Sequence, residues 1–131
     1  MALCAGAPAL AETVQFTATM AGTEEVPPVE TSGHGTTEAT YDTQTKTLTW
    51  TVEYSDLSGP ATAAHFHGPA EPGSIADVSV PIPEPLDSPI KGSAELTDEQ
   101  AADLMAGRLY ANIHTAEHPD GEIRGQMTQA K

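Results

Sequence analysis

The chain is poor in cysteine, in basic residues and in long apolar runs. Its one cysteine, Cys4, cannot form a disulfide within the chain, and it falls in the first eleven of 131 residues. A blue-copper centre and the cysteine-rich zinc sites need thiolate ligands, so the rest of the chain excludes both. No stretch approaches the ~20 apolar residues that span a bilayer, so we expect no membrane-spanning segment.

The scarcity of basic residues excludes another class of partner. Five Lys and Arg stand against nineteen Asp and Glu, which gives a net charge of -14. Five scattered cations cannot form the basic patch that a phosphate backbone or an anionic membrane surface requires. We therefore expect no nucleic-acid partner. Such an acidic surface is typical of a soluble protein that attracts cations.

The first residues, MALCAGAPALA, are small and apolar. They end in Ala9-Leu10-Ala11, an A-x-A pattern of the kind that precedes signal-peptide cleavage. We interpret residues 1–11 as the remnant of an export signal, with residues 12–131 as one mature domain that is periplasmic or secreted. A disordered alanine-rich terminus is the alternative.

Alternation of apolar and polar residues, the period of a half-buried strand, recurs at short intervals. The clearest case is Leu48, Trp50, Val52 and Tyr54, which places Trp50 in the core. Pro81 and Pro83 interrupt another segment and favour an edge position for it. The predicted strands centre on residues 14–20, 39–41, 48–54, 62–67, 78–82, 94–96, 109–113 and 123–127.

One interruption of this pattern is helical. Thr97 followed by Gln100 fits a capping box, and Gly107 can end the helix in a left-handed conformation, so we expect a short helix near 98–106. About seven to eight short strands with turns between them predict an all-β fold. We expect an immunoglobulin-like Greek-key β-sandwich.

Two of the five histidines lie one residue apart, in AAHFHGPA. Residues i and i+2 of a strand point to the same face, about 7 Å apart, so His65 and His67 can aim at one point. Phe66 between them belongs in the core, which puts both histidines on the outward face. The pair could bind a metal ion, or it could be two polar residues on a wet surface.

A third histidine favours the metal. In RLYANIHT the apolar residues Leu109, Ala111 and Ile113 point inward, which places Tyr110, Asn112 and His114 outward. If the two strands are neighbours, about 4.8 Å apart, His114 converges with His65 and His67 on one site with open positions for water or substrate. Neutral imidazoles without thiolate favour Cu(II), by the affinity order, or Zn(II), by availability.

Other polar residues are weaker candidates. His118, four residues after His114, could be an accessory to the site or loop surface, and His34, between two glycines, is expected in a loop. Glu122 and Arg124 share one strand face and are interpreted as a surface or semi-buried ion pair. The chain has no nucleophile motif, no phosphate-binding glycine loop and no dinucleotide fingerprint, and we assign no catalytic or organic-cofactor residue.

Taken together, four segments resemble the CHRD (chordin-type) domain of bacterial exported proteins. They are EEVPPV, AAHFHGPA, GSAELTDEQAADLMAGRLYANIHT and HPDGEIRGQ, which occur in the family's order between about Glu12 and Gln129. The resemblance implies an immunoglobulin-like β-sandwich and leaves the biochemical role open. The residues at the family's motif positions are His65, His67, Gly68, Pro69, His114, Gly121, Glu122, Arg124 and Gly125.

Three functions remain open. The chain could be a metal-binding protein that holds copper or zinc through His65, His67 and His114. It could be an adhesive or protein-interaction module that uses the same face without a metal. It could be a copper-dependent redox enzyme, since H-x-H plus a distant histidine also resembles the copper face of Cu,Zn superoxide dismutase. The chain lacks that enzyme's disulfide and bridging histidine constellation, so we favour a metal-binding protein over an enzyme.

Overall fold

The computed structural model describes residues 12–130, and this part of the chain is all-β with one short α-helix, as predicted. Each segment in which apolar residues alternate is a strand. The elements are β1 (Thr13–Ala21), the 3-10 helix η1 (Gly22–Glu24), β2 (His34–Asp42), β3 (Thr47–Ser55), β4 (Ala61–His67), β5 (Val78–Ile82), β6 (Ile90–Glu95), α1 (Asp98–Met105), β7 (Tyr110–Thr115), β8 (Ile123–Gln126) and β9 (Thr128–Gln129).

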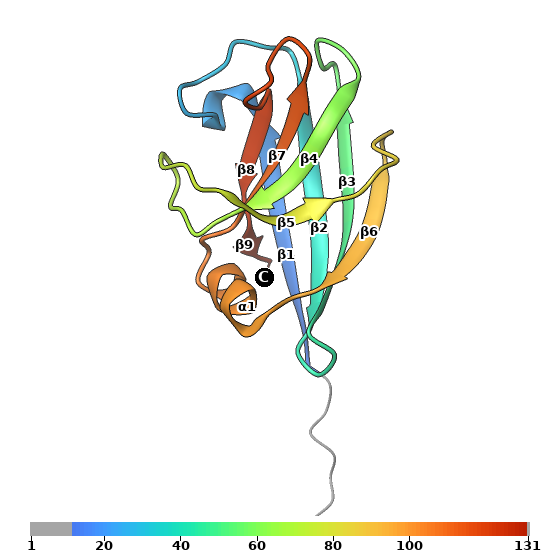
Figure 1. Ribbon diagram of the computed structural model, residues 1–131, viewed down its shortest axis with the longest axis vertical. Coiled ribbons are helices and arrows are strands. Elements are labelled where there is room, and N and C mark those ends of the chain that lie inside the picture. The colour runs from blue at the N-terminus through green and yellow to red at the C-terminus, as the bar shows by residue number, and fades with distance from the viewer. Residues whose placement is uncertain (1–11, 131) are drawn as a thin grey trace, which may run out of the picture.

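The strands follow the order β5-β4-β7-β8-β1-β2-β3-β6, with β9 beside β1 and every neighbouring pair antiparallel. Between β8 and β1 the pairing is a single position, where Ala21 lies opposite Arg124. The sheet therefore has two four-stranded halves joined along one side, and it curls over so that β4 and β5 cross in front of β1 and β2 (Figure 1). The result is a nearly closed sandwich. Strand β5 is at an edge, as its prolines predicted.

The core lies between the two halves. Trp50 of β3 is 1 % exposed, and its ring meets the Phe66 ring of β4 edge to face, with 5.3 Å between ring centroids. The inward placement of Trp50 and Phe66 is therefore confirmed. Buried apolar residues of the strands, of α1 and of the connections complete the core, among them Phe16, Met20, Leu48, Val80, Leu104, Leu109, Ile113, Ile123 and Met127.

The helix α1 has the predicted caps. The Gln100 backbone N–H donates to the Thr97 hydroxyl oxygen at 3.1 Å, and the Thr97 N–H donates to the Gln100 side chain at 2.8 Å. After the helix, Gly107 adopts a φ of 76°, which suits a residue without a Cβ. At eight residues, α1 is too short to cross a bilayer, and residues 12–130 contain no helix that could.

The outward face of β4, β7 and β8 is covered by loops. The Tyr110 hydroxyl accepts a hydrogen bond from the backbone N–H of Ala76, and the Asn112 amide donates to Glu25 at 2.6 Å. Tyr110 and Asn112 point outward as predicted, yet they are only 4 % and 3 % exposed. The outward direction of these two side chains does not expose them to solvent, because the chain near Glu25 and the β4–β5 connection fold over the sheet.

Candidate metal site

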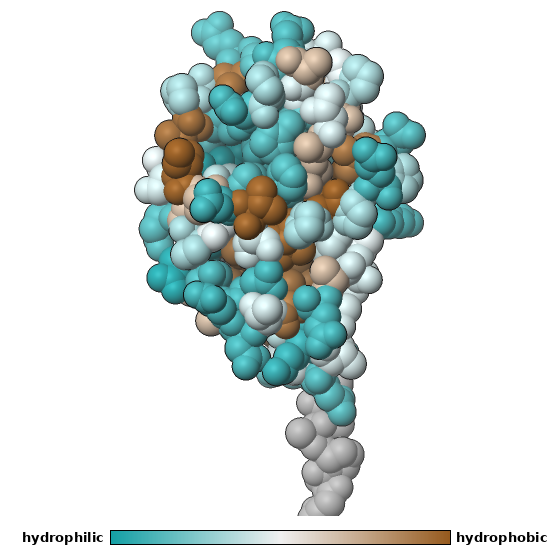
Figure 2. Space-filling view, viewed as in Figure 1, coloured by the Kyte–Doolittle hydropathy of each residue, from teal (hydrophilic) through white to brown (hydrophobic). Residues whose placement is uncertain are grey.

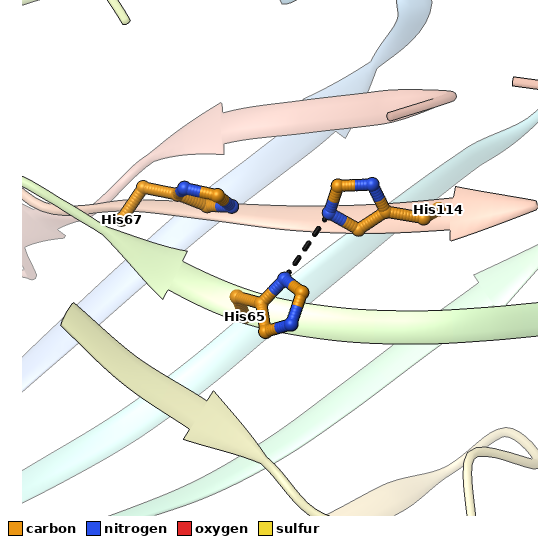
Figure 3. A group of neighbouring side chains, drawn as sticks. All are labelled: His65, His67 and His114. Atoms are coloured by element: carbon orange, nitrogen blue, oxygen red, sulfur yellow. Dashed lines mark hydrogen bonds between the residues drawn. The ribbon is translucent and has the colours of Figure 1, made fainter. Parts of the chain in front are cut away.

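The three histidines of the predicted site lie together on this covered face. Strands β4 and β7 are neighbours, with His65 opposite Asn112 and Ala63 opposite His114. One nitrogen of each ring of His65, His67 and His114 lies within 4.8 Å of the others. Figure 3 shows the three imidazoles facing one another from the two strands. The parity of two strands thus predicted a real cluster.

Backbone carbonyls orient two of the three rings. His67 Nδ1 lies 3.0 Å from the carbonyl oxygen of Ala76, and His114 Nδ1 lies 2.9 Å from that of Pro119. A carbonyl oxygen only accepts hydrogen bonds, so in both rings Nδ1 carries the proton and Nε2 keeps its lone pair. This is the arrangement by which proteins orient histidine ligands toward a metal.

The spacing of one pair of ring nitrogens suits a small dication. His65 Nδ1 and His114 Nε2 are 3.2 Å apart, and this contact is the dashed line of Figure 3. Two nitrogens bound tetrahedrally at 2.0–2.1 Å from one ion would be about 3.3 Å apart. The Nε2 atom of His67 is buried and has no hydrogen-bond partner within the described residues. An orphaned lone pair beside two other imidazoles fits a metal ligand, since buried polar atoms are normally satisfied.

The site also favours neutral rings. Burial lowers the pKa of His65, and the neighbouring His114 and His67 lower it further. Burial is the main cause that lowers the pKa of His67 as well; His114 and Arg124 act in the same direction, against the hydrogen bond to Ala76. At neutral pH both rings are therefore ready to bind a metal without losing a proton.

Aromatic and charged groups support the ring of His67. Tyr110 stacks on it with 4.9 Å between centroids and 7° between the planes. The guanidinium carbon of Arg124 lies 3.5 Å from the centroid of the Tyr110 ring. A cavity of about 310 Å³ opens beside this stack, and both His67 and His114 contribute to its walls. The cluster is therefore accessible to a small molecule from one side.

The two accessory histidines lie outside the cluster. His34 is the first residue of β2, so the expectation of a loop is wrong; its ring contacts the hydroxyl of Ser55 at 3.0 Å and the carbonyl oxygen of Ser32 at 3.1 Å. The backbone of His118 forms a turn with Thr115, and His118 lines another pocket together with Pro119. Neither belongs to the group of three.

The interpretation of Glu122 and Arg124 as an ion pair is also wrong. Both are buried, at 0 % and 2 % exposed, and no ion pair joins them among the described residues. Glu122 instead accepts hydrogen bonds from the hydroxyls of Thr31, Ser58 and Thr115 and from the Ser58 N–H, at 2.6 to 2.9 Å. Burial would raise the pKa of Glu122, but these bonds outweigh it and lower the pKa to about 2.

Sequence reasoning missed Glu25 as a neighbour of the site. Its side chain contributes to the same cavity as His67 and His114, and it is 8 % exposed. Burial raises the pKa of Glu25 to about 7, although the hydrogen bond from Asn112 and the charge of Arg124 act in the opposite direction. The parity of its strand placed Asn112 on the same face as His114. Glu25 could not be placed in this way, because it lies 87 residues from Asn112 and no periodic pattern connects them.

Comparison with protein families identifies the domain. The family model of the CHRD domain matches residues 16–127, which is nearly all of the described chain. No curated protein and no solved structure matches the chain. The matched range contains the three histidines, Glu25, Glu122 and Arg124. With this coverage, the chain belongs to the family of CHRD domain proteins.

Proposed function

We propose that the protein is an exported metal-binding protein that holds one Cu(II) or Zn(II) ion through His65, His67 and His114. The observation that carries the proposal is the buried Nε2 of His67, which has no partner within residues 12–130 and faces two more imidazoles. The carbonyl of Ala76 fixes the proton on the other nitrogen of this ring, so the free lone pair is available to a cation.

Copper is the preferred ion, and zinc is the second. The donor set is three neutral imidazoles, and the affinity order of divalent metals places Cu(II) above Zn(II) for such ligands. Three protein ligands leave at least one position for water or another ligand. We assign the site to metal storage, delivery or resistance.

The periplasmic or secreted location is part of the same proposal. Its support is the Ala9-Leu10-Ala11 pattern ahead of Glu12, in residues that lie outside the described part of the chain. Mass spectrometry of the protein from its native compartment should give a chain that starts at or near Glu12. Recovery from the cytosol with residues 1–11 intact would refute export.

The metal site is tested by titration of untagged protein with Cu(II), followed by calorimetry and electron paramagnetic resonance. We expect one equivalent per chain, with nitrogen hyperfine structure in the spectrum. Replacement of His65, His67 or His114 by alanine should weaken binding by a large and similar factor. The matched controls are His34→Ala and His118→Ala, which remove histidines outside the cluster.

The copper titration, together with an assay of superoxide and peroxide turnover, separates the other two functions. A folded protein that binds no metal would be an interaction module, in which the histidines serve as polar contacts. A metal-loaded protein that turns over superoxide or peroxide would be a redox enzyme, and the open coordination position is what that chemistry would use. Unchanged copper affinity in the His65→Ala and His114→Ala variants would eliminate the three-histidine site.

A further inference from the structure

The cavity beside the histidines contains a cation that forms no ion pair within the described residues. Arg124 contributes to the walls of this cavity together with His67 and His114. Its side chain is 2 % exposed, and no carboxylate in residues 12–130 lies within 4.0 Å of it. Buried charges in proteins are normally paired, so a buried and unpaired guanidinium requires an explanation.

The hydrogen bonds of Arg124 do not explain how its buried charge is stabilised. Among the described residues, its side chain makes one hydrogen bond, from Nη2 to the carbonyl oxygen of Glu71 at 3.3 Å. A guanidinium has five N–H donors. The ring of Tyr110 covers one of its faces, but an aromatic ring is no substitute for acceptors in the guanidinium plane. Most of the donor capacity of Arg124 is therefore free for a ligand.

A metal ion on the histidines would increase the need for negative charge. Arg124 lines the same cavity as His67 and His114, so a dication held by the three rings would add positive charge beside the guanidinium. Two carboxyl groups, of Glu25 and Asp120, share the cavity. Glu25 is bonded to Asn112, and its pKa, raised to about 7, leaves it partly protonated at neutral pH. These two carboxyl groups offset only part of the positive charge that the metal ion and Arg124 would carry together.

We propose that this cavity binds a small carboxylate-type anion between the metal ion and Arg124. One oxygen of the anion takes the open coordination position on the metal, and the carboxylate accepts hydrogen bonds from the guanidinium, whose fork matches two carboxylate oxygens. The cavity, at about 310 Å³, has room for such a ligand. This inference rests on the proposed metal site, which supplies the second binding partner of the anion.

Formate is a suitable probe, and Zn(II) keeps the protein diamagnetic for nuclear magnetic resonance. The ring signals of His65, His67 and His114 report the metal, and the Nε–H signal of Arg124 reports the anion, so the two proposals have separate readouts. We expect Zn(II) to shift the ring signals and formate then to shift the Arg124 signal saturably. If Zn(II) leaves the rings unchanged, the metal site is refuted. The formate titration of the metal-free protein then decides the anion site alone.

Variants establish the role of Arg124. Arg124→Gln should bind Zn(II) and should bind formate at least about tenfold more weakly, because charge-assisted hydrogen bonds are lost. The matched control is Arg108→Gln, which removes the same charge from an exposed side chain paired with Asp103. If Arg124→Gln does not fold, Arg124→Lys keeps the charge and should still bind formate more weakly. Equal formate affinity in parent and variant, or an Arg124 signal that formate leaves unchanged, would overturn the anion site.

Discussion

Single buried side chains hold the two halves of this sandwich together, and Trp50 is the largest of them. Its ring contacts Phe66 across the core. Trp50→Ala should lower the free energy of unfolding by about 3–5 kcal/mol, as other large-to-small changes of buried aromatics do. Denaturant unfolding measures the loss. Thr49→Ala, at an exposed position on the same strand, is the control, and a Trp50→Ala loss no larger than that of the control would contradict the core assignment.

Glu122 is a buried carboxylate that ties three segments together through hydroxyl donors. Its folded-state pKa of about 2 is below the ordinary value of 4.5, so the unfolded chain binds more protons in this window. The stabilisation from Glu122 is therefore complete above pH 4.5 and is lost as the pH falls toward 2. Glu122→Gln should lower the free energy of unfolding at neutral pH by about 1–3 kcal/mol, because buried donors lose their acceptor.

The measurement for Glu122 is urea unfolding of parent and variant at a series of pH values. The free energies of unfolding of parent and variant should converge as the pH falls below 4.5. Protonation of Glu122 then removes from the parent the ionised carboxylate acceptor that the substitution has already removed from the variant. Glu38→Gln, at an exposed position of β2, is the control for the change in net charge. Parallel curves for parent and Glu122→Gln would show that Glu122 titrates at its ordinary pKa.

At the scale of elements, most of what the sequence predicted came from the alternation of apolar and polar residues along each strand. Alternation placed Phe66 inward and His65 outward, and the same parity placed Ile113 inward and His114 outward. The parity of a residue predicts which face of the sheet its side chain points to, but it does not predict which strands are neighbours. The histidine cluster also requires that β4 pairs with β7, and this pairing is known only from the structure. Once the two strands pair, the histidine cluster follows from the register.

Parity also cannot show what covers a face. Asn112 and Arg124 point away from the core, and yet both are buried because loops distant in sequence bond to them. Those contacts depend on where each loop leaves the sheet, which periodicity does not encode. This is why Glu122 and Arg124 were expected to be a surface or semi-buried ion pair, and why Glu25 was not connected to the site.

The helix α1 is the element whose local sequence predicted it most directly. Thr97 and Gln100 form both hydrogen bonds of a capping box, and the Gln100 amide also donates to the carbonyl oxygen of Ser79 in β5. Thr97→Ala should lower the free energy of unfolding by about 1 kcal/mol, as loss of an N-cap does. Thr97→Ser keeps the hydroxyl and should stay close to the parent in thermal unfolding. Equal losses in the two variants would show that the cap hydroxyl contributes nothing.

At the scale of the whole molecule, the net negative charge and the histidine site both favour the binding of a cation. The chain carries a net charge of -14, and hydrophilic side chains cover most of the face in Figure 2, with apolar ones in small separate patches. A negative protein raises the local concentration of cations around it. Arg124, the positively charged side chain that lines the cavity with His67 and His114, is buried below this surface. Long-range attraction therefore brings a dication to the protein, and the imidazoles provide the specific ligands.

Metal binding should stabilise the whole fold, because the site joins two strands to the loops that cover them. His67 and His114 each bond to a covering loop, through Ala76 and Pro119, so an ion on the three rings would hold both loops and both strands. A ligand that binds only the folded state stabilises it by about 2.7 kcal/mol when its free concentration is 100 times its Kd. Addition of Cu(II) or Zn(II) should therefore raise the Tm, and a chelator should reverse the rise.

The pH dependence of this stabilisation follows from the histidines. The pKa values of His65 and His67 are both lowered from 6.5 in the folded protein, so the rings are neutral above that pH and protons compete with the metal only below it. The metal-dependent rise in Tm should be complete at pH 7 and should fade as the pH falls below 6.5. His67→Ala should abolish the rise at every pH, whereas His34→Ala should keep it. A rise that persists in His67→Ala, or that is the same at pH 5 as at pH 7, would mean that the ion stabilises the protein through its acidic surface and that the three imidazoles are not its ligands.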